Sequence, residues 1–428
     1  MVGSYRSCRA PVRDLRYSRR KARCLWHRLL YLTTEGTPML DFKLISADSH
    51  VNEPPAAWER VQKAYGERAP RVAKDPPGVP KGIWLLIDGL PPVGLSHYSK
   101  GLVGSKNQGI SEVEQEKHFE TIRFNETFHY EDYPGGWEPA ARLKDQDADG
   151  VEAEILFSSA VRQLYSITDE PFQRAIFRSY NAWLHEFCRH NPKRLLGLAT
   201  LSILDIAHTV ADIDEYAKLG FRGVQIPTRI RDSGYYERKY EPLWAALEET
   251  GMIVNVHTSA TQGVARKHYE GPRDVDPKKQ SLGFATKQAP AQQVLGNMIL
   301  SGVFDRYPKL KVVCAEFDVG WVANLVQQVD YWFGRASTFD AEKNINMLPP
   351  SEYFKRNAFF TYQDDRAGVL TASVYGEDNF LWASDYPHGV TTWPNSQATV
   401  ERNCAGIDPA VMRKLNHDNV AKLYRLEH

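Results

Sequence analysis

The chain has 428 residues, 42% of them hydrophobic and 25% charged, and this balance excludes an intrinsically disordered or collagen-like protein. No apolar run approaches the ~20 residues of a membrane span, and the five cysteines are scattered without a CxxC pair, which excludes a disulfide scaffold. The formal net charge of zero hides an asymmetry, because residues 1–34 hold eight Arg and one Lys against one acid and leave the remainder at about −8.

This charge distribution bears on partners and on domain organisation. A body of net negative charge binds nucleic acid poorly, so we expect neither a nucleic-acid nor a membrane partner. The cysteine pattern favours a reducing compartment and predicts a cytoplasmic protein. Residues 1–38 are interpreted as a basic leader that is disordered or a non-native extension, although a transit peptide or a nucleic-acid arm has the same composition. Residues 39–428 are expected to form one domain.

From residue 44 onward, short apolar runs alternate with longer amphipathic stretches. Each run is mostly apolar and ends in a polar tip, the pattern of strands that are buried on both faces of a parallel sheet. The eight predicted strands lie at 43–50, 151–159, 195–202, 223–229, 252–259, 311–320, 357–365 and 379–388.

Amphipathic helical patterns fill the intervals between these strands. The clearest predicted helices lie at 170–190, 205–220, 241–251, 321–333 and 409–426. Strand and helix alternating eight times predict an α/β protein, a (β/α)₈ TIM barrel. A doubly wound open sheet is the alternative fold, but no GxGxxG follows an early strand, so its dinucleotide-binding version has no support.

A long insertion follows the first predicted strand, at residues 51–150, and is rich in Pro and Gly. Because it leaves the carboxyl end of a barrel strand, we expect it to cap the face on which barrel active sites are built. A second insertion, at 260–283, follows the fifth strand and should overhang the same face. The aromatic residues of the first insertion would line a substrate pocket or form its own small core. They are Trp84, Tyr98, Phe119, Phe128 and Trp137.

Side chains that bind metal ions stand at several predicted strand tips. Asp48 and His50 end the first strand in a D-S-H motif, and alternate residues of a strand point the same way. His257 ends the fifth strand, Glu316 lies in the sixth and Asp385 at the tip of the eighth. This mixed set of imidazoles and carboxylates suits zinc, manganese or iron. Taken singly, each has an ordinary structural explanation, so the prediction depends on their joint placement.

At these residues the sequence resembles a known family. The motifs ADSHVNEP, DxDGVEAEILF, VNVHTS and WASDYPH are similar to those of the amidohydrolase superfamily, in the amidohydrolase-2 branch that includes aminocarboxymuconate-semialdehyde and resorcylate decarboxylases. The resemblance runs from about residue 44 to residue 425. It implies one divalent metal ion, zinc or manganese, held by Asp48, His50, His257 and Asp385.

Two departures from the family pattern affect the expected chemistry. The commonest first motif is HxH, and the acidic first residue here makes manganese a competitor to zinc. The usual strand-6 histidine is replaced in CAEFDVGW, so Glu316 is expected to stand in its place. It would act as an acid or base, with a metal ligand and a structural residue as the alternatives. Asp385 is the other expected proton-transfer group. His388, three residues later, would bind a substrate carboxylate, act as an acid or serve a structural role.

The resemblance implies a metal-dependent enzyme that acts on a small molecule. The expected reaction is nonoxidative decarboxylation of a small aromatic or unsaturated carboxylic acid. The alternative is hydrolysis of an amide, a lactone or an activated C–C bond by a metal-activated water. A barrel kept only as a binding protein is a minor alternative, which the intact ligand set argues against. A homo-oligomer, a dimer or larger, is also expected.

Overall fold

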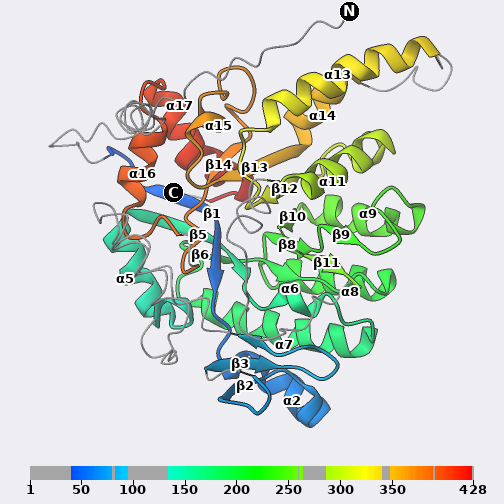
Figure 1. Cartoon of the computed structure of the whole chain (residues 1–428), viewed down its shortest axis with the longest axis vertical. Coiled ribbons are helices and arrows are strands. Elements are labelled where there is room, and N and C mark those ends of the chain that lie inside the picture. The colour runs from blue at the N-terminus through cyan, green and yellow to red at the C-terminus, as the bar shows by residue number, and fades with distance from the viewer. Residues whose placement is uncertain are drawn as a thin grey trace, which may run out of the picture. The chain divides into compact units, whose positions relative to one another are not determined.

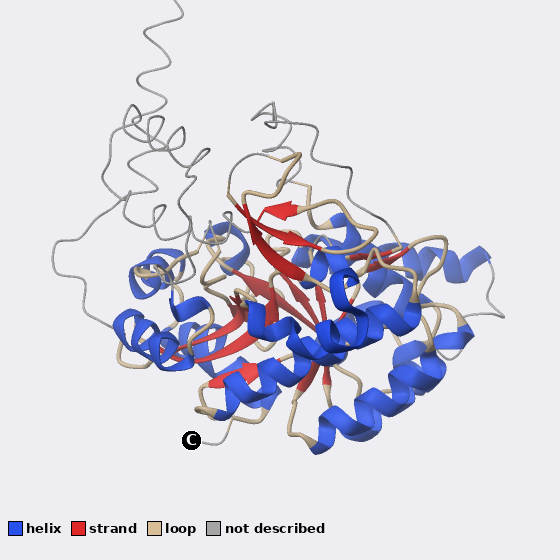
Figure 2. Ribbon diagram, turned by 90° about the horizontal axis from the view of Figure 1, so that it is seen from below, coloured by secondary structure: helices blue, strands red, loops and turns tan. Residues whose placement is uncertain are grey.

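The computed structural model describes residues 40–79, 82–94, 134–258, 260–263, 286–339, 348–388 and 391–426. Within them, parallel strands lie at the centre and helices surround them (Figures 1 and 2). The barrel strands are β1 (Leu44–Val51), β5 (Val151–Ser158), β6 (Leu195–Gly197), β7 (Ala199–Thr200), β8 (Gly223–Ile226), β10 (Ile253–His257), β12 (Val312–Ala315), β13 (Ala358–Tyr362) and β14 (Phe380–Trp382). Strands β6 and β7 occupy a single predicted strand, so the eight predicted strands are all present.

The strand order is that of a closed (β/α)₈ barrel. Hydrogen-bonded neighbours run β1-β5-β6 in one sheet and β7-β8-β10-β12-β13-β14 in the other. The two sheets join at Leu198, whose N–H donates to the carbonyl of Leu156 in β5, while β7 pairs with β8. At the other seam the N–H of Asp385 donates to the carbonyl of Asp48, and the N–H of His50 donates to that of Tyr386. The predicted TIM-barrel fold is therefore confirmed.

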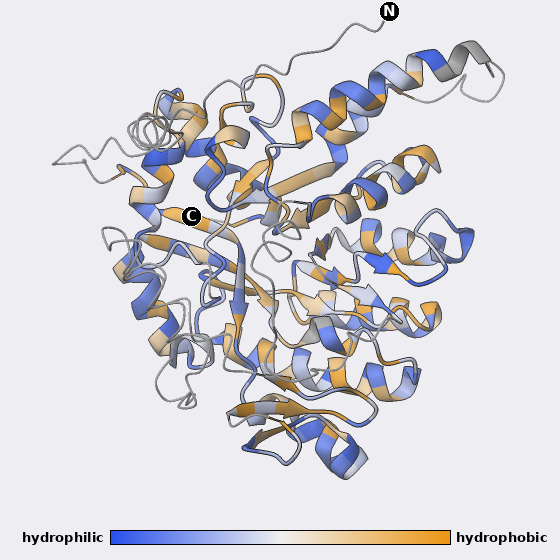
Figure 3. Ribbon diagram, viewed as in Figure 1, coloured by the Kyte–Doolittle hydropathy of each residue, from blue (hydrophilic) through white to orange (hydrophobic). Residues whose placement is uncertain are grey.

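The barrel strands are buried on both faces because alternate side chains serve two different cores. Inward-facing residues such as Ile45, Ala153 and Val313 belong to a cluster that fills the barrel. Their neighbours Leu44, Val254 and Val312 belong to a second cluster, between the strands and the helices. The strands are accordingly the most apolar part of the chain, and the outer faces of the helices are hydrophilic (Figure 3).

The larger helices surround the barrel. They are α5 (Pro139–Asp149), α7 (Glu170–Arg189), α8 (Ile206–Lys218), α9 (Glu241–Thr250), α11 (Ala289–Leu300), α13 (Val322–Phe339), α14 (Pro350–Asn357) and α16 (Ser396–Asn403). Those at 170–189, 206–218, 241–250 and 322–339 lie at predicted places, and the others were not predicted individually. Shorter turns are α6 (Val161–Leu164), η7 (Arg238–Tyr240), α12 (Val303–Arg306) and α15 (Arg366–Val369). None of the helices in the described ranges combines the length and apolar character needed to span a lipid bilayer.

The last predicted helix, at 409–426, differs in detail from the structure. It is divided into α17 (Pro409–Arg413), a π-helical turn η8 (Lys414–Asp418) and α18 (Asn419–Tyr424). Within the π turn the buried amide of Asn416 accepts a hydrogen bond from the Tyr362 hydroxyl and donates one to the carbonyl of Met412. This wider turn places a polar side chain against β13, which a hydrophobic period cannot predict.

The described parts of the first insertion form a small subdomain and the elements that lead into β5. Its elements are η1 (Pro55–Trp58), α2 (Glu59–Tyr65), η2 (Gly66–Arg68), the antiparallel strands β2 (Arg71–Lys74), β3 (Ile83–Leu86) and β4 (Val93–Gly94), and the turn η6 (Pro134–Gly136). Trp58 stacks on Tyr180 of α7, and Trp84 is buried in β3. Tyr98, Phe119, Phe128, most of 260–283 and residues 1–39 lie outside the described residues, so the cap over the mouth remains a prediction.

Short strands β9 (Arg229–Ile230) and β11 (Thr261–Gln262) pair in parallel beyond the ends of β8 and β10. This pairing extends the loops that follow two neighbouring barrel strands on the same face as the predicted site. The hydroxyl of Thr228 donates to the carbonyl of His257 there, which ties the β8 loop to a predicted metal ligand.

Candidate metal centre

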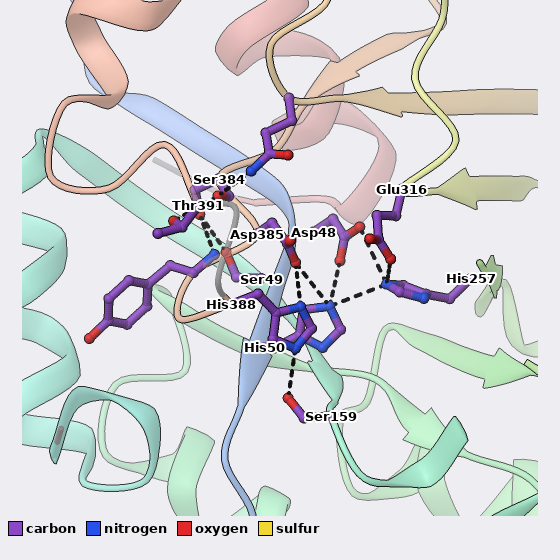
Figure 4. A network of polar contacts seen from close by, with 12 residues as sticks. Asp48, Ser49, His50, Ser159, His257, Glu316, Ser384, Asp385, His388 and Thr391 are labelled. Atoms are coloured by element: carbon purple, nitrogen blue, oxygen red, sulfur yellow. Dashed lines mark hydrogen bonds and ion pairs between the residues drawn. The ribbon is translucent and has the colours of Figure 1, made fainter. Parts of the chain in front are cut away.

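The six predicted site residues meet at the carboxyl end of the barrel (Figure 4). Asp48 and His50 come from the end of β1 and His257 is the last residue of β10. Glu316 follows β12, while Asp385 and His388 lie in the loop after β14. Parallel strands of a barrel all end on one face, so residues far apart in the chain converge there.

Two imidazole nitrogens form the centre of this cluster. Nε2 of His50 lies 3.2 Å from Nε2 of His257. Asp48 contacts both rings, with Oδ1 at 3.4 Å from Nε2 of His50 and Oδ2 at 3.7 Å from Nε2 of His257. Asp385 Oδ1 lies 3.4 Å from Nε2 of His50. All four side chains are almost completely buried.

The donor set fits a divalent cation. Nδ1 of His257 lies 3.1 Å from the carbonyl of Thr258, and only a protonated Nδ1 can donate to a carbonyl. The neutral ring then turns the lone pair of Nε2 toward His50 and Asp48, the tautomer that second-shell hydrogen bonds select in metal sites. Buried carboxylates and imidazole lone pairs this close together are costly unless a positive charge lies among them. Donor atoms of Asp48, His50 and His257 lie within 4.8 Å of one another.

A second group of possible ligands, namely His50, Asp385 and His388, shares one residue with the first. Nδ1 of His388 lies only 2.8 Å from Oδ1 of Asp385, which is a hydrogen-bonding distance for a protonated nitrogen and a carboxylate. The His388 ring also stacks on the His50 ring, with centroids 3.7 Å apart. Nε2 of His50 lies 3.2 Å from Nε2 of His257 and so already belongs to the first group. We therefore interpret the second group as a His–Asp hydrogen-bonded pair beside one metal site.

Glu316 lies at the edge of the cluster. Its Oε2 is 3.3 Å from Nε2 of His257, and its N–H donates to the Thr361 hydroxyl at 2.8 Å. The backbone at Glu316 has φ 64° and at Asp385 φ 57°, a left-handed conformation that non-glycine residues rarely adopt. Both turns aim an acidic side chain back over the strand ends, and such strained residues concentrate at functional sites.

A positive charge lies near the acidic residues. Nζ of Lys287, just before α11, pairs with Oδ2 of Asp318 at 2.9 Å. Burial alone would lower the pKa of Lys287. The charges of Asp318, Glu316 and Asp385 and the hydrogen bond that Lys287 donates to Asp318 together raise this pKa above its ordinary value. Lys287 is therefore held as a cation within electrostatic range of the site.

A buried Arg–Glu pair that was not predicted from the sequence supports the main chain next to these ligands. Arg142 of α5 is completely buried, and its Nε donates to Oε2 of Glu154 in β5 at 2.5 Å. Its Nη1 donates to the carbonyl of His50 at 2.9 Å and its Nη2 to that of Tyr386 at 3.3 Å. The pair thus holds the main chain on both sides of the β1–β14 seam. A charged residue inside an apolar predicted strand, Glu154, was the available signal.

Other residues have structural roles. Arg178 on α7 pairs with Asp212 and Glu215 of α8, away from the site. Asn181 exchanges hydrogen bonds with the backbone of Thr200 and so fixes α7 against β7. The thiol of Cys314 is buried in the core, and burial raises its pKa well above the usual range.

Comparisons with known proteins identify relatives of this chain. A family model described as amidohydrolase matches residues 47–426. The 2-amino-3-carboxymuconate-6-semialdehyde decarboxylase of Dictyostelium discoideum is 23% identical over 256 residues, or 59% of this chain and 67% of that protein. The gamma-resorcylate decarboxylase of Rhodococcus jostii is 24% identical over 303 residues, or 67% of this chain and 87% of that protein.

A solved structure shares the fold. It is a 5-carboxyvanillate decarboxylase from Novosphingobium aromaticivorans, complexed with manganese and 4-hydroxy-3-methoxy-5-nitrobenzoic acid. It aligns with a TM-score of 0.59 at 18% identity and covers 90% of this chain and 97% of its own. At that identity the likeness concerns the fold, whereas the family model spans nearly the whole described chain.

Proposed function

This chain belongs to the amidohydrolase family, and on that premise we propose that it is a divalent-metal-dependent carboxy-lyase. Its substrate would be a small aromatic acid that carries a hydroxyl group, and the reaction would release carbon dioxide without an oxidant. The observation that carries the proposal is the convergence of Asp48, His50 and His257 on one buried point, with Asp385 beside them. The relatives reported above support the reaction class because they are named as decarboxylases.

The metal ion would be held by Asp48, His50, His257 and Asp385. Two imidazoles and two carboxylates accept manganese as well as zinc, and the manganese in a structure of the same fold supports manganese as the first choice. When bound, the ion supplies a Lewis acid that binds the oxygens of an acidic substrate.

The protein side chains would supply the proton that the reaction needs. Loss of carbon dioxide leaves an electron pair on the ring carbon, and a proton must take the place of the carboxyl group there. Asp385 is the proposed group that delivers this proton, after it takes one up from Nδ1 of His388. It lies at the ligand cluster and accepts the hydrogen bond of that nitrogen. Glu316, at the edge of the cluster, is the proposed second proton-transfer group. The Lys287 ammonium would offset the negative charge that an acidic substrate brings.

Hydrolysis is the second candidate function. The Asp385–His388 pair is equally well placed to accept a proton from a water molecule at the cluster. The two functions differ in their products, since only decarboxylation releases carbon dioxide from a substrate that has no hydrolysable bond.

The test begins with purified protein loaded with manganese or with zinc. We expect one metal ion per chain by elemental analysis, and carbon dioxide release from gamma-resorcylate, 5-carboxyvanillate or a related hydroxybenzoate. A parallel panel of lactones and amides is assayed for acid release. Acid release without any carbon dioxide would replace the decarboxylase with the hydrolase.

A variant pair tests the metal site itself. His257→Ala should remove most of the bound metal and abolish activity, because it deletes a nitrogen at the centre of the cluster. His208→Ala is the matched control, since His208 lies half-exposed on α8 and pairs with Glu170. It should keep both metal and turnover. Full metal occupancy and normal turnover in His257→Ala would refute the assignment.

A further inference from the structure

A chain of three hydrogen-bonded side chains runs from the metal centre to the residue that follows the carboxyl end of β5. Oδ1 of Asp385 lies 2.8 Å from Nδ1 of His388, and Nε2 of His388 lies 3.0 Å from Oγ of Ser159. Ser159 follows β5 directly, and none of the three residues is more than 7% exposed. Figure 4 shows the imidazole held between the serine and the aspartate.

The direction of the hydrogen bonds follows from the chemistry of the groups. An ionised carboxylate only accepts, so Nδ1 of His388 carries the proton that faces Asp385. In the neutral ring Nε2 then has a lone pair, and the Ser159 hydroxyl must donate to it. The ring is therefore tied at both ends, while its face stacks on His50.

The same three residue types form the triad of serine hydrolases, in which the serine is at the reacting end. In this protein the order is reversed, with the aspartate at the reacting end. The aspartate faces the reacting site, 3.4 Å from a predicted metal ligand, and the serine lies at the far end. Ser159 is 1% exposed, so its hydroxyl is not open to solvent. It is therefore placed to hold the ring, in contrast to a nucleophile, which must reach the reacting carbon.

The serine is itself held in place by the loop after β1. Glu53 is 3% exposed, and both oxygens of its carboxylate accept the N–H of Ala160 at 3.1 Å. The hydroxyl of Ser158 donates to the same carboxylate. These bonds fix the main chain on either side of Ser159. The loop directly after β1, the strand that carries Asp48 and His50, thus also sets the position of the hydroxyl.

We propose that Ser159 is a positioning residue of the site, which anchors the His388 ring so that its Nδ1–H stays on Oδ1 of Asp385. Asp385 is thereby held in the rotamer that faces the metal centre. The role of Asp385 in proton transfer rests on the proposed function, whereas the anchoring of the ring does not. Ser159 acts through His388 and touches neither metal nor substrate.

The kinetic test compares three variants in manganese-loaded protein, with gamma-resorcylate or 5-carboxyvanillate as the substrate. Ser159→Ala should lower kcat on the order of 10-fold to 100-fold, the usual cost of losing such an outer partner, with metal content and KM nearly unchanged. Ser159→Thr, which restores a hydroxyl, should recover most of the loss. Ser166→Ala is the control, since the Ser166 hydroxyl donates to the carbonyl of Gln163 in the same segment and lies outside the chain.

A spectroscopic test does not depend on turnover. In zinc-loaded, ¹⁵N-histidine-labelled protein, the Nδ1–H of His388 should give a resolved downfield proton resonance, which is assigned by its loss in His388→Gln. Ser159→Ala should broaden or remove this resonance, and both Ser159→Thr and Ser166→Ala should retain it. This comparison stands even if the wild-type protein releases no carbon dioxide, so the proposed function and the positioning role can fail separately.

The outcomes that overturn the proposal are specific. An unchanged resonance together with unchanged kcat in Ser159→Ala would show that the ring needs no anchor. Loss of metal in that variant would show that the hydroxyl acts on the metal site directly, and this too would refute the assignment. If Ser159→Ala does not fold, Ser159→Thr carries the test, since a folded threonine variant that lacks the resonance contradicts the anchoring role.

Discussion

Glu316 differs from the other acidic side chains of the centre in its exposure. Its side chain is 15% exposed, whereas those of Asp48 and Asp385 are 1% and 3% exposed. It contacts His257 from the open side of the cluster, at 3.3 Å. A group in that position can exchange protons with solvent between turnovers, which a fully buried carboxylate cannot do without a relay.

We therefore expect Glu316→Gln to keep its metal and lose about 100-fold or more in kcat, the usual scale for a positioned proton-transfer group. The amide retains the shape of the side chain but carries no transferable proton at neutral pH. Metal content, melting temperature and kcat are measured together. Glu352→Gln, on the exposed face of α14, is the control and should behave as wild type.

Two results would contradict this role for Glu316. Joint loss of metal and activity would make Glu316 a ligand. A stable, metal-replete and fully active Glu316→Gln protein would leave it without any function at the site.

The predicted site residues have one feature in common, which explains why sequence could indicate them. Each is a polar residue at the end of an apolar run, and strand tips of a barrel meet on one face. Arg142 has no such signal, because its partners are the carbonyls of His50 and Tyr386, 92 and 244 positions away. Ser159 was not predicted either, because its partner His388 is 229 positions away. Hydrogen bonds between distant loops depend on the fold and leave no local pattern.

At the scale of elements, strands and helices were predicted correctly where the apolar residues of a segment follow a single periodicity. All eight strands were located because their apolar runs are short and bounded by polar tips. The long helix α7 is preceded by its N-cap residue, Asp169, whose side chain accepts a hydrogen bond from the N–H of Phe172. Aspartate is a preferred N-cap residue, so this helix start can be predicted from the sequence. The π turn at 414–418 was missed because it depends on the buried contact of Asn416 with Tyr362.

The junction of α5 with α16 offers a prediction about pH. Asp149, the last residue of α5, is buried and accepts hydrogen bonds from the N–H and the hydroxyl of Ser396, the first residue of α16. Burial raises the pKa of Asp149 to about 7, although the bonds from Ser396 oppose the rise. In the unfolded chain an aspartate has a pKa of about 3.9.

The sign of the effect follows from proton linkage. Between pH ~4 and ~7 the folded state binds the proton more tightly than the unfolded state, so this group makes the folded protein less stable as pH rises. The stabilisation that Asp149 contributes to the folded state is fully present below pH ~4 and is lost as pH rises through about 7. Asp149→Asn cannot titrate. We therefore expect the melting temperature of wild type to fall more steeply from pH 5 to pH 8 than that of Asp149→Asn.

Asp205, the N-cap of α8, provides the contrast. The hydrogen bond from the N–H of His208 lowers the pKa of Asp205, so this carboxyl is ionised in both states above pH 5. Asp205→Asn should therefore change the pH dependence of the melting temperature far less than Asp149→Asn does between pH 5 and pH 8. Parallel melting curves for wild type and Asp149→Asn over that range would contradict the role assigned to Asp149.

At the scale of the whole molecule, the resemblance to the amidohydrolase family and the barrel fold were both predicted from sequence and are confirmed. The motifs that carried the resemblance lie at strand ends that the barrel brings together. The cap expected from 51–150 stays a prediction, because the described parts of that insertion pack against α7 through Trp58 and its central part lies outside the described residues. Long insertions have few internal constraints that sequence can reveal.

The placement of the predicted ligands also links metal binding to the stability of the barrel. Asp48 and His50 lie on β1, Asp385 follows β14 across the seam, and His257 lies on β10 on the far side of the barrel mouth. Without a cation, these buried carboxylates and lone pairs repel one another at the point where the barrel closes. A ligand that binds only the folded state at 100 times its Kd adds ~2.7 kcal/mol to the free energy of unfolding.

For a large domain, that increase in the free energy of unfolding corresponds to a rise in melting temperature of roughly 3–6 °C. We expect a rise of this size when manganese or zinc is added to chelator-treated protein. His257→Ala should show little of this rise, since it lacks a central donor, and His208→Ala should show all of it. Calorimetry at one fixed scan rate compares the three proteins. If wild type binds one ion per chain yet melts at the same temperature with and without it, the ion cannot be held by residues that join β1, β10 and β14.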